Sequence, residues 1–295
     1  MDRLFDWDLY GRLFALPYVQ AALVAAAILG VLAGVLGPLI VSRNMAFAVH
    51  GTSELAFTGG AAALLLGADV GHGALAGAIV AALVLGLLSR RSSDHDSVIG
   101  AVLSFGLGVG VLLLWFYPGR AANKFGLLVG QIVGVDFASI ALLASCGIGV
   151  LLVLLVIYRP LLFASVDPDV AKARGVPVGM LSIVFAVLVG VATALGVQTV
   201  GALLVLALMI TPAAAAARVT ASPLRATVLA VIFAETAALG GFILSLAPGA
   251  PVSAFVTGIS FLIYLVCWTV GRGRGRVGRT PRLPDAVQLH GGVSG

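Results

Sequence analysis

The sequence predicts an all-α membrane protein, a polytopic transmembrane helical bundle of about nine spans. Of its 295 residues, 61% are hydrophobic and only 10% are charged, whereas an ordinary soluble domain has roughly 45–50% apolar and 25% charged residues. Apolar stretches of about 20 residues, enough for a helix to cross a ~30 Å hydrocarbon core, recur along almost the whole chain. A soluble globule is therefore excluded. So is an outer-membrane barrel, because its strands alternate apolar and polar residues.

Nine apolar segments make up the predicted bundle, and eight is the alternative, because only Val197 and Gln198 separate segments six and seven. The segments cover residues 17–41, 45–66, 72–89, 98–117, 138–158, 178–196, 199–217, 226–247 and 252–270. The Gly-rich stretch 122–136 is too short to cross and is expected to be an external or re-entrant piece. A transmembrane domain is thus predicted over 1–271. It is followed over 272–295 by a disordered basic tail that could contact anionic lipid.

The basic residues predict the orientation of these segments. With the N-terminus outside, thirteen of the 17 Lys and Arg residues fall on the cytoplasmic side, as the positive-inside rule requires. The other side holds Arg3, Arg12, Arg120 and Lys124. The C-terminus is therefore expected to be cytoplasmic. Because the basic residues are scattered between apolar segments, they do not indicate nucleic-acid binding.

Only two of the 12 acidic residues, Glu54 and Glu235, lie deep inside apolar segments. A carboxylate at the bilayer centre costs at least ~2.5–3.5 kcal/mol on insertion scales, so each requires an explanation. His50 precedes Glu54 by one helical turn, which places both on one face. Imidazole with carboxylate suits Zn²⁺ or Mn²⁺, and Glu235 could close such a site from another helix. A hydrogen-bonded pair holding helices together and a proton relay are the alternatives.

His72, near Asp69, is interpreted as a solvated loop histidine rather than an entrance residue.

Several enzyme classes are excluded by missing motifs. The chain has no H-E-x-x-H sequence, no Ser flanked by Gly at both minus two and plus two, and no Walker context around its two lysines. We therefore expect a protein that is not an enzyme, binds no permanent cofactor and cannot hydrolyse ATP alone.

The loop between segments five and six predicts a short cytoplasmic helix of about two turns. Asp167 is a suitable N-cap, Pro168 suits the first helical position, and Gly175 with Pro177 forms a stop signal. A partner could grip such a helix to move the bundle, and an ordinary interfacial helix is an equal alternative.

Four stretches together resemble the zinc/manganese-type permease family of ATP-binding-cassette importers, and look closest to its zinc permeases. The stretches are 43–47 leading into His50, Ser53, Glu54 and Gly59; 128–135; 167–171 with 175–177; and 200–213 continuing to 216–218.

The resemblance implies a type II importer-like permease in the plasma membrane that works as a homodimer with its path on the dimer axis. An extracytoplasmic metal-binding protein would feed it and two copies of a cytoplasmic ATP-binding subunit would drive it. The loop residues would then be the coupling helix, namely Asp167, Pro168, Asp169, Ala171 and Gly175. Where this chain has His50 and Glu54, the family commonly places an aspartate and a histidine, so the carboxylate and imidazole have exchanged places.

From the ligand types we expect Zn²⁺ as the transported ion and Mn²⁺ as the alternative. A proton-coupled secondary metal transporter could use the same residues, but no pair of inverted halves is visible in the sequence and the 167–175 loop would have no role. An importer permease for a metal chelate or vitamin would need a wide apolar or aromatic path instead of the carboxylate–imidazole pair. A purely structural subunit would leave both buried carboxylates unexplained.

Overall fold

The computed structural model describes residues 7–88, 95–119, 137–200, 202–246 and 251–277, and these residues form eleven helices. Helices satisfy their own backbone hydrogen bonds, which the bilayer core demands. The helices are α1 (Trp7–Phe14), α2 (Pro17–Ser42), α3 (Ala46–Leu65), α4 (Val70–Leu88), α5 (His95–Phe116), α7 (Phe137–Val166), α8 (Pro168–Ala173), α9 (Val178–Val200), α10 (Ala202–Val219), α11 (Pro223–Leu246) and α12 (Val252–Val277).

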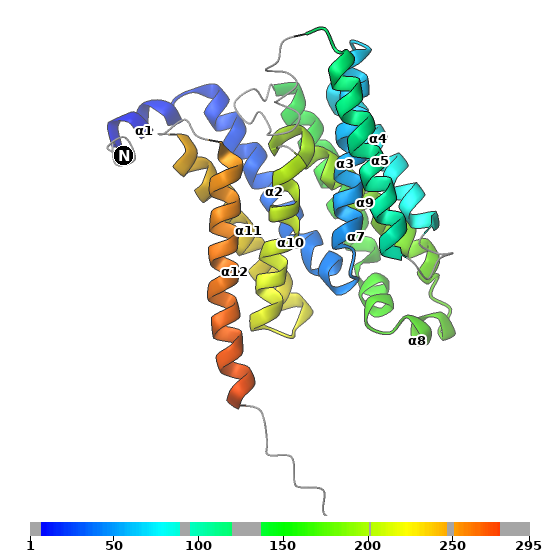
Figure 1. Cartoon of the computed structure of the whole chain (residues 1–295). Helices are drawn as coiled ribbons and strands as arrows, with labels where there is room; N and C mark the ends of the chain where they lie inside the picture. Colours follow the sequence, from blue (N-terminus) through cyan, green and yellow to red (C-terminus); the bar gives the residue numbers. More distant parts are fainter. Residues whose placement is uncertain (1–6, 89–94, 120–136, 201, 247–250, 278–295) are drawn as a thin grey trace, which may run out of the picture.

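The helices pack as two groups. One group is α2 with α10, α11 and α12, and the other is α3 with α4, α5, α7 and α9. In Figure 1 the first group lies on the left and the second on the right. Contacts of α2 with α7 and α9, and of α10 with α3 and α9, join the two groups. The short helix α8 contacts α7 and α9 at the lower end of the bundle.

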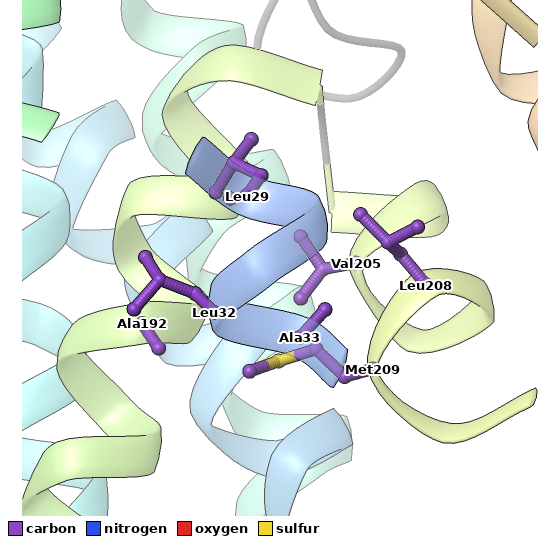
Figure 2. A pocket seen from close by; sticks show the side chains of 8 residues that line it. Leu29, Leu32, Ala33, Ala192, Val205, Leu208 and Met209 are labelled. Carbon is purple, nitrogen blue, oxygen red and sulfur yellow. The ribbon is translucent and has the colours of Figure 1, made fainter. Parts of the chain in front are cut away.

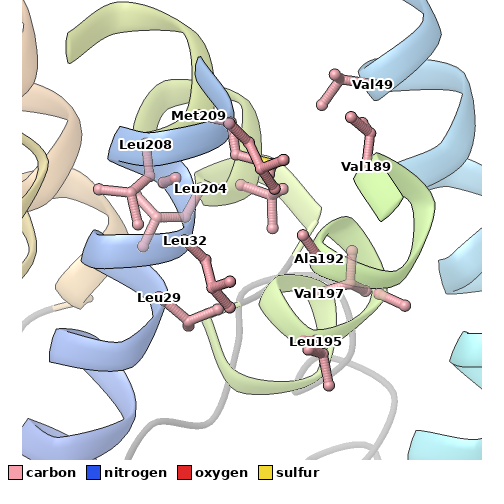
Figure 3. Close-up of a cluster of buried hydrophobic side chains, with 14 of the residues drawn as sticks. Leu29, Leu32, Val49, Val189, Ala192, Leu195, Val197, Leu204, Leu208 and Met209 are labelled. Carbon is pink, nitrogen blue, oxygen red and sulfur yellow. The ribbon is translucent and has the colours of Figure 1, made fainter. Parts of the chain in front are cut away.

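The apolar core lies where these groups meet. Figure 3 shows Leu29 and Leu32 of α2 near Ala192 of α9 and Met209 of α10, and Val189 of α9 near Val49 of α3. Their side chains are almost completely buried. In a bilayer such packing is held by van der Waals contact, because lipid tails are as apolar as leucine.

Six helices of the described chain are long and apolar enough to cross a membrane, by length and composition. Two shorter apolar helical stretches, Val70–Leu85 and Leu204–Val219, accompany them. Helix α3 is not in either set, because polar residues such as His50 and Glu54 lower its hydropathy. The predicted all-helical membrane bundle is confirmed, and a helix covers each of the nine predicted segments. The division into nine spans stays a prediction.

Two helices extend beyond the predicted apolar segments. Helix α7 continues through Arg159 and Pro160 to Val166 instead of ending at 158. Pro160 lacks a backbone donor, but Leu161 and Ala164 beyond it are buried against the bundle and hold the last turns in place. Helix α12 reaches Val277, so the first six residues of the predicted tail are helical.

The predicted break near Val197 and Gln198 lies instead after Val200, because α9 and α10 are separate helices. Helix α1 was not predicted. The expected external piece at 122–136 and the tail beyond 277 lie outside the described residues.

Candidate functional site

Helix α3 carries several polar residues and is enclosed by neighbouring helices. It packs against α4, α5, α9 and α10, and close contacts fix its position. A Cβ on Gly59 would meet the backbone of Gly73 and Gly77 on α4, so glycine allows the two helices to touch. On another side, the Thr58 hydroxyl lies 2.6 Å from the carbonyl oxygen of Gly106 on α5. Polar side chains on α3 are therefore held inside the protein.

His50 and Glu54 lie together on this helix, one turn apart. Glu54 is only 7% exposed, and the His50 ring is close enough to interact electrostatically with its carboxylate. His50 Nδ1 is buried and has no hydrogen-bond partner within the described part of the chain. A buried imidazole nitrogen with no partner is costly and leaves a lone pair free for a ligand. The pair therefore offers one nitrogen and one carboxylate to a cation.

Glu235 lies elsewhere, on α11 in the other helix group. Its carboxylate rests against Gly30 of α2, where an added Cβ would come within 2.7 Å of Oε1. Oε1 is buried and has no hydrogen-bond partner among the residues described. Over those same residues, no three His, Cys, Asp or Glu side chains converge on one point. The structure thus brings His50 and Glu54 together without placing Glu235 in a three-ligand cluster with them.

The sequence analysis did not predict that the Glu235 carboxylate packs against a glycine of α2, Gly30. Gly30, Gly34 and Gly37 follow one another at helical spacing. Gly34 packs against Val231 of α11, and Gly37 against Met209 of α10. Small residues at this spacing are typical of close helix contacts in membranes, and the pattern is visible in the sequence.

A narrow apolar cavity lies beside these residues but does not suit an ion. Figure 2 shows Leu29, Leu32 and Ala33 of α2 on its wall, facing Ala192 of α9 and Met209 of α10. Its lining carries no charged side chain, so a desolvated cation would find no oxygen or nitrogen side-chain ligand there.

His72 is exposed, as predicted, but it lies in the first turn of α4 and not in a loop. Its ring Nδ1 lies 2.6 Å from Asp69 Oδ1, and both side chains are more than half exposed. Asp69 also accepts a hydrogen bond from the backbone N–H of His72 and so caps α4. These two residues form a solvated helix cap.

The short helix predicted in the 159–177 loop is present as α8, and both of its ends are defined by the sequence. The Asp167 carboxylate accepts a hydrogen bond from the Val170 N–H at 3.0 Å, with Pro168 in the first turn. At the other end Gly175 has φ +80°. Its N–H donates to the Lys172 carbonyl, and the next N–H, of Val176, donates to Ala171. This is a Schellman motif, and the positive φ explains the glycine.

One residue of helix α8 is buried against the bundle, and most of the others are exposed. Ala171 is fully buried, while Pro168, Asp169, Lys172 and Ala173 are exposed. The Lys172–Asp169 contact, at 3.5 Å between exposed side chains, adds little stability. The exposed face of α8 is therefore available to another protein.

Comparison with known proteins agrees with this architecture. The chain matches the ABC 3 transport family over residues 15–271. It is 32% identical to the manganese transport system membrane protein MntC of Halalkalibacterium halodurans, over 80% of this chain and 81% of that protein. It is 31% identical to the manganese import system permease protein ScaB of Streptococcus parasanguinis, over 68% of this chain and 71% of that one.

A solved structure has the same fold. The structure of PsaBC from Streptococcus pneumoniae in complex with Fab matches with a TM-score of 0.80 and 26% identity, covering 88% of this chain and 94% of that chain. Similarity over nearly the whole length, joined to the helical membrane bundle described above, leads to one assignment. The chain belongs to the ABC 3 transport family, as a membrane permease subunit that is not itself an ATPase.

Proposed function

We propose that this chain is the permease subunit of an ATP-driven importer of a divalent transition metal, with Mn²⁺ as the principal ion. The observation that carries the proposal is the His50–Glu54 pair. A buried carboxylate and an imidazole nitrogen that has no hydrogen-bond partner among the described residues share one face of the enclosed helix α3. Intramembrane ionisable groups of this kind mark ion pathways.

Two considerations decide the order of the ions. The ligand types alone favour Zn²⁺ slightly, because imidazole suits zinc, while carboxylate suits manganese as well. The two similar permeases named above are both manganese proteins, and affinity alone does not decide selectivity. We therefore place Mn²⁺ first and Zn²⁺ second, which reverses the order expected from the ligands.

The pair provides two side-chain ligands, which fits transient binding better than storage. An ion in transit must bind strongly enough to lose water and weakly enough to leave. The remaining ligands would be water or groups met along the path. Glu235, on the other helix group, would be a separate carboxylate on the route.

The exposed helix α8 provides the connection to ATP hydrolysis. The positive-inside distribution supports a cytoplasmic position for α8 and for the C-terminus, at the plasma membrane. There its face would dock into an ATP-binding subunit, with Asp167, Pro168, Asp169 and Gly175 defining its shape around the buried Ala171. Two copies of this chain with two ATPases, fed by an extracytoplasmic metal-binding protein, would form the working importer.

Metal uptake tests the proposal directly. Cells that express the chain with its ATPase and binding protein are given radioactive Mn²⁺ or Zn²⁺, and His50→Ala and Glu54→Gln are compared with wild type at equal membrane abundance. His72→Ala and Asp69→Asn are matched controls, because they change the same residue types in the exposed cap. We expect both α3 variants to lose at least about tenfold in uptake rate, which corresponds to ~1.4 kcal/mol, and both controls to keep the wild-type rate.

Three results would contradict parts of the proposal. Unchanged uptake in both α3 variants would remove the pair from the ion path. Uptake that persists with an ATPase unable to hydrolyse ATP would favour a secondary transporter. Faster uptake of Zn²⁺ than of Mn²⁺ at equal free concentration would restore the order expected from the ligands.

A further inference from the structure

Arg43 joins three helix ends at the side of the bundle where α8 lies. Its Nη1 donates to Ser165 Oγ at 2.9 Å, and its Nη2 donates to Ser182 Oγ at 2.6 Å. The guanidinium also lies 5.6 Å from the centre of the Phe185 ring, in cation–π geometry. Ser165 belongs to the last turn of α7, and Ser182 belongs to the first turns of α9. The two nitrogens of one side chain therefore hold the two helices that flank α8.

The two serines are fixed acceptors. Ser165 donates its own proton to the Leu161 carbonyl at 2.7 Å, and Ser182 donates to the Val178 carbonyl at 2.9 Å. Each hydroxyl oxygen is therefore oriented by its helix, and its lone pairs remain for Arg43. The aromatic partner, Phe185, is fully buried. The guanidinium of Arg43 therefore contacts Ser165 of α7 and both Ser182 and Phe185 of α9.

At its own backbone, Arg43 belongs to the turn that starts α3. Arg43 caps α2, and Asn44 follows with φ +54°. The Asn44 N–H donates to Val41, and the Met45 N–H donates to Ile40 at 3.0 Å. This is again a Schellman motif, with asparagine in the left-handed position. Two backbone N–H groups of the turn thus bond back to α2, and α3 begins directly after the turn at Ala46.

The same turn leads to the ion ligands. His50 lies in the second turn of α3, four residues after that helix begins at Ala46. Arg43 is half-buried, and within the described residues it forms no ion pair with a carboxylate. Its charge is satisfied by hydroxyl oxygens and an aromatic face, a geometry that suits the planar guanidinium fork and not an ammonium.

We infer that Arg43 is a positioning residue that transmits movement of α8 to α3, so that ATPase closure on the coupling helix shifts the His50–Glu54 pair. This inference rests on the proposed function. When the ATPases pull α8, the adjoining ends of α7 and α9 move with it. The Arg43 fork then carries that displacement into the turn before α3. Without the Arg43 guanidinium, α8 would still dock into the ATPase, and His50 and Glu54 would still lie together. Movement of α8 would then no longer move α3.

The variants that test this role are Arg43→Gln, Arg43→Lys and the double change Ser165→Ala with Ser182→Ala. Arg218→Gln is the matched control, because Arg218 on α10 also donates to a hydroxyl, Tyr264 Oη on α12, at 3.1 Å and lies over that ring. Each variant is purified as the full complex with its ATPase and reconstituted with the metal-loaded binding protein. Five quantities are measured: ATPase co-purification, melting temperature, basal ATP hydrolysis, Mn²⁺ uptake rate, and the Mn²⁺ concentration that gives half-maximal uptake.

For Arg43→Gln we expect the maximal uptake rate to fall at least about tenfold, with the half-maximal Mn²⁺ concentration and basal hydrolysis within about twofold of wild type. Arg43→Lys should be intermediate, because an ammonium lacks the planar fork that meets both serines. The double serine variant should resemble Arg43→Gln, and adding it to Arg43→Gln should cause little further loss, because both changes break the same link. Arg218→Gln should keep the wild-type uptake rate.

Uptake by Arg43→Gln within about twofold of wild type would overturn the inference. The inference would also be overturned if Arg43→Gln lowered ATPase co-purification, the melting temperature and the uptake rate together. That pattern would mean that Arg43 only stabilises the fold. Fully additive losses in the combined variant would also contradict the inference. If wild type itself took up no metal, the proposed function would fail and the transmission role with it. Normal wild-type uptake beside an unimpaired Arg43→Gln would refute the transmission role alone.

Discussion

The contact between α3 and α4 depends on the absence of a side chain at Gly59, and replacing it with alanine should weaken the fold. The added Cβ would meet the Gly73 carbonyl oxygen and would lie 3.0 Å from both Cα and N of Gly77. All three atoms belong to the backbone of α4. A flexible side chain could rotate away, but here one helix must shift against the other. Overpacking of this kind costs about 1–3 kcal/mol.

The magnitude can be isolated with a second variant. Gly108 on α5 has no atom within 4 Å of an added Cβ, so Gly108→Ala should gain about 0.5–1 kcal/mol from helix propensity alone. Gly59→Ala gains the same term, because it is also inside a helix. The difference between the two variants therefore reports the clash. At about 2–4 °C per kcal/mol, the two melting temperatures should differ by about 2–12 °C.

The assay is thermal unfolding of both purified variants in the same detergent and at the same protein concentration. Gly59→Ala should melt below wild type, and Gly108→Ala at or above it. If Gly59→Ala melted as high as Gly108→Ala, the close approach of α3 and α4 would be refuted. Glycine would then not be what fixes the position of α3, the helix that carries His50 and Glu54.

Three further outcomes are expected. Asp167→Ala should lower ATPase co-purification, because loss of this N-cap costs the short helix about 1 kcal/mol. Asp69→Ala, which removes the side-chain cap of α4 instead, should not, and equal effects of the two changes would argue against the docking role of the α8 cap. Glu235→Gln should keep or raise the melting temperature, because a neutral amide is easier to bury beside α2. Mn²⁺ uptake by the same variant should fall several-fold. An uptake rate equal to that of wild type would remove Glu235 from the ion path. The pKa of Asp69 lies below its ordinary value because the backbone N–H of His72, and then its side chain, bond to it. The cap on α4 therefore contributes stability at neutral pH and loses it as pH falls through the lowered pKa. Asp69→Ala should lower the melting temperature at neutral pH by the equivalent of about 0.5–2 kcal/mol and have little effect in acid; an unchanged difference in acid would contradict the cap.

The sequence predicted the features of the fold that depend on local rules. Apolar length located the helices, and the Asp167, Pro168 and Gly175 signals located α8, because caps and turns require particular residue types. The far end of α7 could not be found this way. Arg159 and Pro160 are local stop signals, and the burial of Leu161 that overrides them comes from distant helices.

The candidate site was predictable only within one helix. His50 and Glu54 are four residues apart, so helix geometry alone places them together. Glu235 lies in another segment, and its position depends on how α11 packs against α2, which spacing does not reveal. The same holds for Arg43, whose partners are more than 100 residues away in the chain. Sequence counted Arg43 as one cytoplasmic charge, whereas the structure gives it three specific neighbours.

The enclosure of α3 has a consequence for handling the protein. The outer helices α5, α7 and α12 display large exposed apolar side chains such as Phe105, Leu155 and Phe261, so these are the surfaces that annular lipids would cover. Around Glu54, by contrast, α3 meets only other helices. Delipidation should therefore loosen the outer helices before it disturbs His50 and Glu54, the proposed metal ligands. Binding of an ion at these two residues should therefore survive the loss of lipid longer than the packing of the outer helices does.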